Sequence, residues 1–208
     1  MKQQQLILFW IPFFALFAFI QEGCHRSNQV FISHEQLSEG DLVFRRGSGA
    51  KSQAVLYADK TGKYSHIGII VKEGSEFMVV HITPGERKPK ETVDKIKMEH
   101  LEDFFAHDKA KQGAILHFID SQEYSKQAAQ YAKMLFEKEI VFDHDYNLDD
   151  STKMYCSEMV WRVYLKAGKD ITERRRSEVP QGFPLFSGTY IFPSDIYQNE
   201  RLTIVYEF

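Results

Sequence analysis

Two apolar runs at residues 64–71 and 77–82 constrain the fold of this chain more than any other feature. Both are rich in β-branched and aromatic side chains, and the five polar residues Lys-Glu-Gly-Ser-Glu separate them. This pattern is typical of a β-hairpin. If Glu73 and Gly74 form the turn, His66 lies directly opposite His81, with Cβ atoms about 4.5–5.5 Å apart. Two alternatives remain: both histidines lie on a solvated face, or a one-residue slip separates them.

A second constraint is the thiol of Cys156, which lies near the start of an amphipathic helical segment at residues 154–168. The sulfur should point inward, because the apolar residues that follow it keep helical spacing: Met159, Val160, Val163, Tyr164 and Ala167. A helix N-terminus with a cationic neighbour can lower a cysteine pKa to about 3.5–7.5, which predicts a nucleophile. The alternative is a buried, inert structural cysteine.

The N-terminus is predicted to be an export signal at residues 1–23. Its apolar run, residues 6–20, is shorter than the roughly 20 residues of a membrane span. Cys24 follows Gly23 as at a bacterial lipoprotein cleavage site, so we expect lipidation of Cys24 and a membrane tether. Because Gln21 and Glu22 depart from the usual residues there, uncleaved anchoring and ordinary secretion are the alternatives. Lipidation would leave Cys156 as the only thiol of the mature domain in an oxidising compartment, which favours a functional role.

The size of the chain, 208 residues with 43% hydrophobic content, indicates one domain. We expect a tether at residues 24–38 and the domain at residues 39–208. The net charge of −3, with both signs interspersed, argues against nucleic acid as a partner.

The remaining pattern predicts an α+β fold in which an antiparallel sheet packs against the Cys156 helix. The expected elements are a strand at residues 42–44, a helix or strand at 52–57, a short helix or turn at 101–105, a strand at 114–119, a helix after Ser121, extended or looped backbone around Pro180, Pro184 and Pro193, and a strand at 202–206.

Two segments superficially resemble ligand-binding loops but lack the glycines that such loops need. Residues 45–52 lack the glycines of a phosphate loop, and residues 143–150 have Leu148 where a calcium loop needs glycine. We interpret the second segment as a polar loop that leads to the Cys156 helix.

One constellation has the residue types for acyl chemistry. Cys156, His66 and His81 supply a nucleophile, a base and an orienting partner. His117, also on a predicted strand, is the rival histidine. A zinc site made of the same three residues is the other alternative, although the close-spaced ligand pair that usually nucleates such a site is missing.

Four segments carry a family resemblance: Gly-Asp-Leu-Val-Phe at residues 40–44, Tyr-Ser-His-Ile-Gly-Ile at 64–69, Tyr-Cys-Ser-Glu-Met-Val at 155–160 and Pro-Ser-Asp-Ile at 193–196. In this order they resemble the YiiX/YebB-like family of permuted papain-fold cysteine hydrolases, relatives of the NlpC-type cell-wall peptidases. In unpermuted enzymes the cysteine precedes the histidine, and here the order is reversed. The resemblance implies a circularly permuted papain-like fold.

The resemblance also implies roles for single residues. Cys156 matches the nucleophile and His66 the general base, while His81 falls at the third position, where many relatives have glutamate. Lecithin:retinol acyltransferase relatives favour histidine there, but their Asn-Cys-Glu-His motif is absent. We interpret Glu158 as a structural or capping carboxylate.

The resulting expectation is an exported cysteine hydrolase, an amidase or peptidase that needs no cofactor and cleaves an amide bond through a thioester. Its expected partners are a peptide or acyl-amide substrate, including peptidoglycan, and a membrane reached through lipidated Cys24. The expected location is the bacterial cell envelope as a lipoprotein, or otherwise the periplasm or the medium. The alternatives are a binding module without catalysis and a lipid acyltransferase or thioesterase of the same fold.

Overall fold

The computed structural model describes residues 34–208 apart from 88–89 and 181–187. The predicted export signal, Cys24 and most of the tether lie outside the described residues. The elements in chain order are η1 (His34–Gln36), β1 (Leu42–Arg46), α1 (Ala50–Ala58), β2 (His66–Glu73), β3 (Glu76–His81), β4 (Lys97–His100), α2 (Leu101–Phe104), β5 (Gln112–Phe118), α3 (Gln122–Glu137), β6 (Val141–Phe142), β7 (Lys153–Met154), α4 (Cys156–Lys166), β8 (Ser177–Val179), β9 (Gly188–Tyr190), α5 (Pro193–Tyr197) and β10 (Leu202–Glu207).

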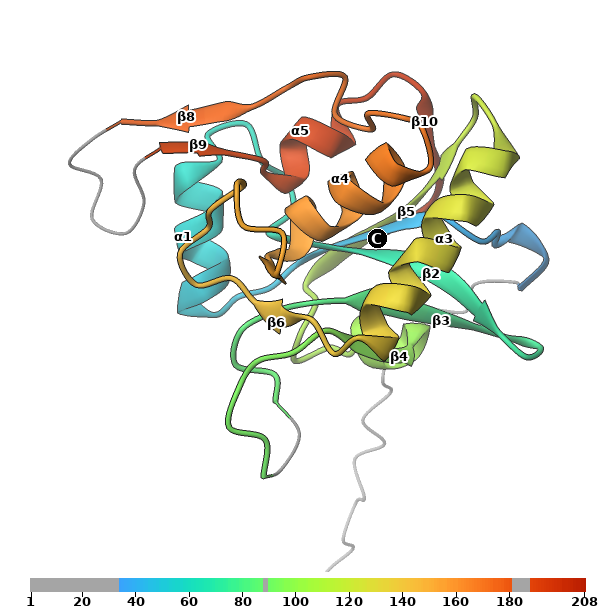
Figure 1. The fold of residues 1–208 in the computed structure, drawn as a ribbon, viewed down its shortest axis with the longest axis horizontal. Coiled ribbons are helices and arrows are strands. Elements are labelled where there is room, and N and C mark those ends of the chain that lie inside the picture. The colour runs from blue at the N-terminus through green and yellow to red at the C-terminus, as the bar shows by residue number, and fades with distance from the viewer. Residues whose placement is uncertain (1–33, 88–89, 181–187) are drawn as a thin grey trace, which may run out of the picture.

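The centre of the molecule is a six-stranded sheet in the order β10-β5-β1-β2-β3-β4, with every neighbouring pair antiparallel. Helices α3 and α4 pack against each other and against β2, in front of the sheet in Figure 1. The α+β class and the sheet on the Cys156 helix are therefore confirmed.

Alternate strand residues build two apolar layers, because successive side chains point to opposite faces of a sheet. Leu42 and Ile69 belong to the larger cluster, which includes the apolar faces of α3 and α4. Val43 and Ile70 belong to the smaller cluster, which includes Phe104 of α2. Both faces of the central strands are thus covered.

The hairpin forms, but its predicted register is wrong by two residues. Ile70 pairs with Val79 and Lys72 with Phe77, whereas the turn at Glu73 and Gly74 would have paired Ile70 with Phe77. The turn instead consists of Gly74 and Ser75. Gly74 has φ +61°, which two-residue hairpin turns require at their first central position. A shift of two residues preserves the faces, so His66 and His81 remain on one face as diagonal neighbours.

Gly68 makes this diagonal contact possible. Extending the observed register places His81 opposite Gly68. A Cβ atom on Gly68 would lie 2.8 Å from Cγ1 of Val79 and 3.0 Å from Cβ of His81. Any other residue at this position would push β3 away from β2.

Several smaller expectations are settled as well. The undecided segment at residues 52–57 lies within α1, and β4 was not predicted. The loop expected around Pro193 is wrong at that residue, since Pro193 begins α5, where its missing N–H costs no hydrogen bond.

Among the described residues, no helix is long and apolar enough to cross a membrane.

Candidate active site

Cys156 occupies the first position of α4, as predicted. Two polar contacts fix this helix end. Glu158 accepts a hydrogen bond from the backbone N–H of Tyr155 at 3.3 Å, and the Tyr155 hydroxyl accepts one from the backbone N–H of Ile191 at 2.9 Å. Arg162 donates to Glu158 at 2.7 Å. The interpretation of Glu158 as a capping carboxylate is therefore confirmed.

His66 and His81 form a buried pair. Nε2 of His66 lies 2.8 Å from Nδ1 of His81, and the two residues are 7% and 0% exposed. Phe104 packs against both imidazoles, with ring centroids 5.6 Å from His66 and 5.0 Å from His81. The structure thus brings the two predicted histidines into direct contact from β2 and β3.

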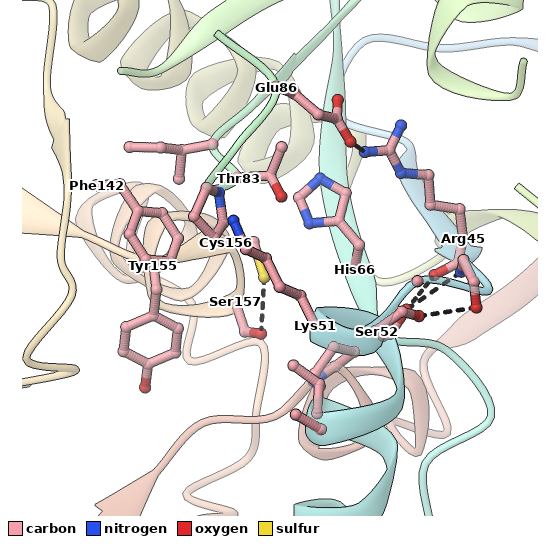
Figure 2. Close-up of a pocket in the computed structure, with 18 of the residues that line it drawn as sticks. Arg45, Lys51, Ser52, His66, Thr83, Glu86, Phe142, Tyr155, Cys156 and Ser157 are labelled. Carbon is pink, nitrogen blue, oxygen red and sulfur yellow. Dashed lines mark hydrogen bonds and ion pairs between the residues drawn. The ribbon is translucent and has the colours of Figure 1, made fainter. Parts of the chain in front are cut away.

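One pocket of about 690 Å³ joins the thiol to His66. Cys156 and His66 both line it, and Figure 2 shows the sulfur and the His66 ring on facing sides. The Cys156 sulfur lies 3.7 Å from Oγ of Ser157, which also lines the pocket. The remaining wall near Cys156 is largely aromatic and includes Phe142, Tyr146, Tyr155, Tyr190 and Phe192.

A carboxylate that the sequence analysis missed completes the arrangement. Oε1 of Glu99 on β4 lies 2.9 Å from Nε2 of His81, so Glu99, His81 and His66 form a continuous hydrogen-bonded series. The available signal was the alternation of apolar Ile96 and Met98 with polar neighbours. This alternation is typical of a strand with one polar face.

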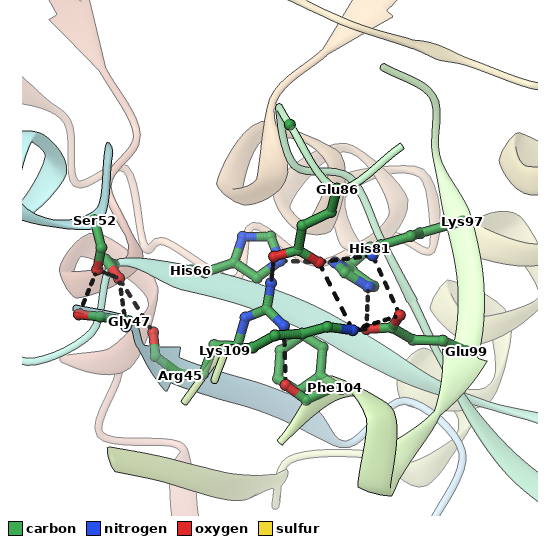
Figure 3. Close-up of polar contacts among 12 residues, drawn as sticks. Arg45, Gly47, Ser52, His66, His81, Glu86, Lys97, Glu99, Phe104 and Lys109 are labelled. Atoms are coloured by element: carbon green, nitrogen blue, oxygen red, sulfur yellow. Dashed lines mark hydrogen bonds and ion pairs between the residues drawn. The ribbon is translucent and has the colours of Figure 1, made fainter. Parts of the chain in front are cut away.

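Charged side chains surround the series from several elements (Figure 3). Lys97 contacts Glu86 at 2.7 Å and Glu99 at 3.2 Å, and Lys109 contacts Glu99 at 3.2 Å. Arg45 pairs with Glu86 and also donates to the backbone carbonyl of Phe104 at 2.9 Å. Three cations therefore hold two carboxylates next to the histidine pair.

The expected low pKa of the thiol is wrong. Burial raises the pKa of Cys156 above its usual value, and this outweighs the lowering effect of the Ser157 hydroxyl and of nearby backbone N–H groups. Burial, together with the charge of Arg45, lowers the pKa of His66 well below its ordinary range. The resting pair is therefore a neutral thiol beside a neutral imidazole.

Burial also lowers the pKa of His81 to about 4, although Glu99 opposes this shift. For Glu99, burial alone would raise the pKa. The hydrogen bond and charge of His81 and the charges of Lys97 and Lys109 lower it instead. At neutral pH, a neutral His81 therefore faces an ionised carboxylate.

We expect the Cys156 thiolate to form only in the alkaline range, because its pKa lies above the usual 9.0. The measurement is the ultraviolet absorbance of the thiolate against pH, taken as the difference between the wild-type protein and the Cys156→Ala variant. The difference should stay small through neutral pH and rise above it. A thiolate signal that persists down to about pH 6 would indicate a thiolate–imidazolium pair and contradict this charge state.

A metal is a poor fit to the one three-donor cluster of the described residues. His81, Glu86 and Glu99 offer ligand atoms within 4.8 Å of one another. However, Glu99 already bonds His81, and Lys97 contacts both carboxylates. A divalent cation would have to displace ammonium groups and add charge where cations already outnumber carboxylates.

The other predicted candidates lie elsewhere. Nδ1 of His117 is 2.7 Å from Oδ1 of Asp41, and His117 does not line the pocket. The segment at residues 143–150 is a polar loop, in which Asp143 accepts backbone hydrogen bonds from Asp145 and Asn147. This carboxylate therefore stabilises the loop.

Comparison with known proteins places this geometry in a wider group. Residues 36–206 match the family described as "Permuted papain-like amidase enzyme, YaeF/YiiX, C92 family". The chain is 28% identical over 145 residues to the uncharacterized protein YiiX of Escherichia coli strain K12, a match that covers 68% of this chain and 64% of that protein. A crystal structure of YiiX from Escherichia coli O157:H7, described as a metalloprotein, has a TM-score of 0.64 at 22% identity and covers 83% of this chain and 98% of the other.

Proposed function

The chain belongs to the family of permuted papain-like amidases, and on this premise we propose that it is an exported cysteine hydrolase that cleaves an amide bond through a thioester on Cys156. The observation that carries the proposal is the placement of Cys156 and His66 in one pocket, with His66 bonded to His81. A nucleophile, a base and an orienting partner are the three parts that acyl transfer through a thiol requires.

The first half of the reaction forms the acyl-enzyme. The Cys156 sulfur attacks the carbonyl carbon of the amide while His66 takes the thiol proton. Because the resting pair is neutral, this transfer occurs during attack. The backbone N–H of Cys156, at the start of α4, helps to hold the oxyanion. The C–N bond then breaks, His66 gives its proton to the amine, and a thioester remains.

The second half restores the enzyme. A water molecule gives a proton to His66 and attacks the thioester carbonyl. The C–S bond breaks, the thiol recovers the proton from His66, and a carboxylic acid leaves. No step requires a metal. Metal binding by YiiX is not carried over to this chain, since the cations beside His81 already occupy the available carboxylates.

The proposed substrates are amides of cell-wall peptides or N-acyl amides. The largely aromatic wall near Cys156 suits an apolar group on the acyl side of the scissile bond. The proposed location is the bacterial cell envelope. It rests on the export signal and on lipidation of Cys24, which the sequence predicts.

Parallel incubation with muropeptides, N-acyl amides and acyl thioesters, followed by mass spectrometry, tests this function. We expect an amide substrate to yield a free acid and an amine with the wild-type protein and not with Cys156→Ala. If both proteins bound a ligand and neither hydrolysed it, the proposed hydrolase activity would be wrong and a binding module would be favoured. Release of acid from thioesters alone would favour a thioesterase.

A further inference from the structure

We propose that Glu99 is a positioning residue, which fixes the tautomers of His81 and His66 so that the bare ring nitrogen of His66 is the one left for the thiol. The inference rests on the proposed function for its role in turnover. The tautomers themselves can be measured without substrate. Glu99 is a further member of the arrangement of Cys156, His66 and His81. It contacts His81 and does not line the pocket.

The argument starts from the carboxylate. An ionised carboxylate accepts hydrogen bonds and donates none, so the 2.9 Å contact with Glu99 requires a proton on Nε2 of His81. Neutral imidazole carries one N–H, which leaves Nδ1 of His81 as an acceptor. The 2.8 Å contact with that atom then requires the proton of His66 to lie on its Nε2.

The same constraint leaves Nδ1 of His66 without a proton. His66 lines the pocket together with Cys156, and its ring faces the Cys156 side in Figure 2. A bare nitrogen is what a general base must present to a thiol. With the opposite tautomers, His66 would present an N–H toward the thiol and could not take its proton.

The surroundings keep Glu99 in its ionised form. Nζ of Lys97 and Nζ of Lys109 each lie 3.2 Å from Oε2 of Glu99, and the side chain is 13% exposed. Oε2 therefore bonds the two ammonium groups, while Oε1 lies closest to His81. The lysines thus hold the carboxylate in place as well as in its charged state.

Five charged side chains close to the histidine pair bear on its chemistry. Arg45 from β1, Lys97 from β4 and Lys109 before β5 are cationic, and Glu86 and Glu99 are anionic. When His66 takes the thiol proton it becomes a fourth cation among these groups. Glu99, through His81, is the carboxylate hydrogen-bonded to the pair and offsets that charge.

The test is the Glu99→Gln variant. A glutamine of similar shape can turn either its carbonyl or its amide toward His81, so it no longer dictates the tautomer. We expect kcat on the amide substrate to fall by about 10²-fold or more, the direction and scale seen when a base loses its tautomer-fixing carboxylate, with KM changed less than about threefold. Glu99→Asp, which retains an acceptor-only carboxylate, should recover part of kcat.

A spectroscopic readout separates positioning from mere structural support. Nitrogen NMR of labelled histidine should show Nε2-protonated His81 and His66 in the wild-type protein and mixed tautomers in Glu99→Gln. Glu73→Gln is the matched control, because Glu73 lies on β2 in a surface ion pair with Lys133, away from the pocket. This control should retain both the tautomers and kcat.

Three outcomes overturn the inference: Nδ1-protonated histidines in the wild-type protein, unchanged tautomers in Glu99→Gln, or an unchanged kcat in that variant. Failure of the proposed function gives a different result. In that case the wild-type protein hydrolyses none of the substrates, while the NMR spectra still show whether Glu99 sets the tautomers.

Discussion

Replacing Cys156 with serine should lower kcat/KM for amide hydrolysis by about 10⁴-fold, the largest effect we expect from any single substitution. The hydroxyl of serine is a much weaker acid than a thiol, and the neutral His66 has too low a pKa to remove its proton. Removing the base with His66→Ala should cost about 10²–10⁴-fold. Because the two residues act as a unit, the double variant should be little worse than Cys156→Ser alone.

Mass spectrometry of the protein during turnover checks this assignment directly. The wild-type protein should gain the mass of the acyl group, and peptide mapping should place it on Cys156. The similar size of serine and cysteine leaves the half-buried site intact, so thermal unfolding should be almost unchanged. If Cys156→Ser retained a tenth of the activity, the nucleophile would have to be another group.

Truncating Phe104 to alanine should have the largest effect on stability, about 3–5 kcal/mol in the free energy of unfolding. Phe104 is fully buried and contacts both imidazoles, and the guanidinium of Arg45 lies 4.6 Å from its ring centroid. Loss of the ring would open a cavity beneath the histidine pair. We therefore expect kcat of the folded protein to fall as well, by about 10-fold.

Phe105→Ala is the matched control. Phe105 lies in the same apolar cluster and is 5% exposed, but its ring contacts are with Phe104 and Phe208. Denaturant unfolding should show a loss of about 2–4 kcal/mol in this variant, while kcat stays near the wild-type value. Equal losses of kcat in the two variants would show that the Phe104 ring has no particular role in aligning the imidazoles.

The parts of the fold that the sequence predicts are those with strong local patterns. Runs of β-branched and aromatic residues locate β2 and β3, and the helical spacing of apolar residues locates α4. The hairpin register was missed because the choice between two adjacent turns depends on which residue adopts positive φ. Gly74 is compatible with either position in the loop, and only the assembled sheet decides between them.

In the candidate site, too, some residues can be predicted from local sequence patterns and others cannot. His66, His81 and Cys156 are visible as unusual residues within regular patterns, and the pocket contains two of them. Glu99 is one of several glutamates in a charged stretch, and the alternation around Ile96 and Met98 indicates a strand without showing which strand it pairs with. Its role depends on β4 lying beside β3, a pairing between residues about 20 apart. The sequence indicates a helix N-terminus at Cys156, which favours a low thiol pKa, but it does not show how deeply the thiol is buried. That burial raises the pKa instead.

The position of α4 in the chain has a consequence for folding. Its Tyr164 hydroxyl donates to the carbonyl of Gly40 at 2.7 Å, across 124 residues, and β10, the last strand, closes the sheet edge against β5. Such long-range contacts form late, after the loops that join them have closed. A chain that stops before residue 154 contains both imidazoles but lacks the Cys156 thiol. In the proposed reaction such a chain cannot form the thioester, because the base and its histidine partner are present before the sulfur that accepts the acyl group.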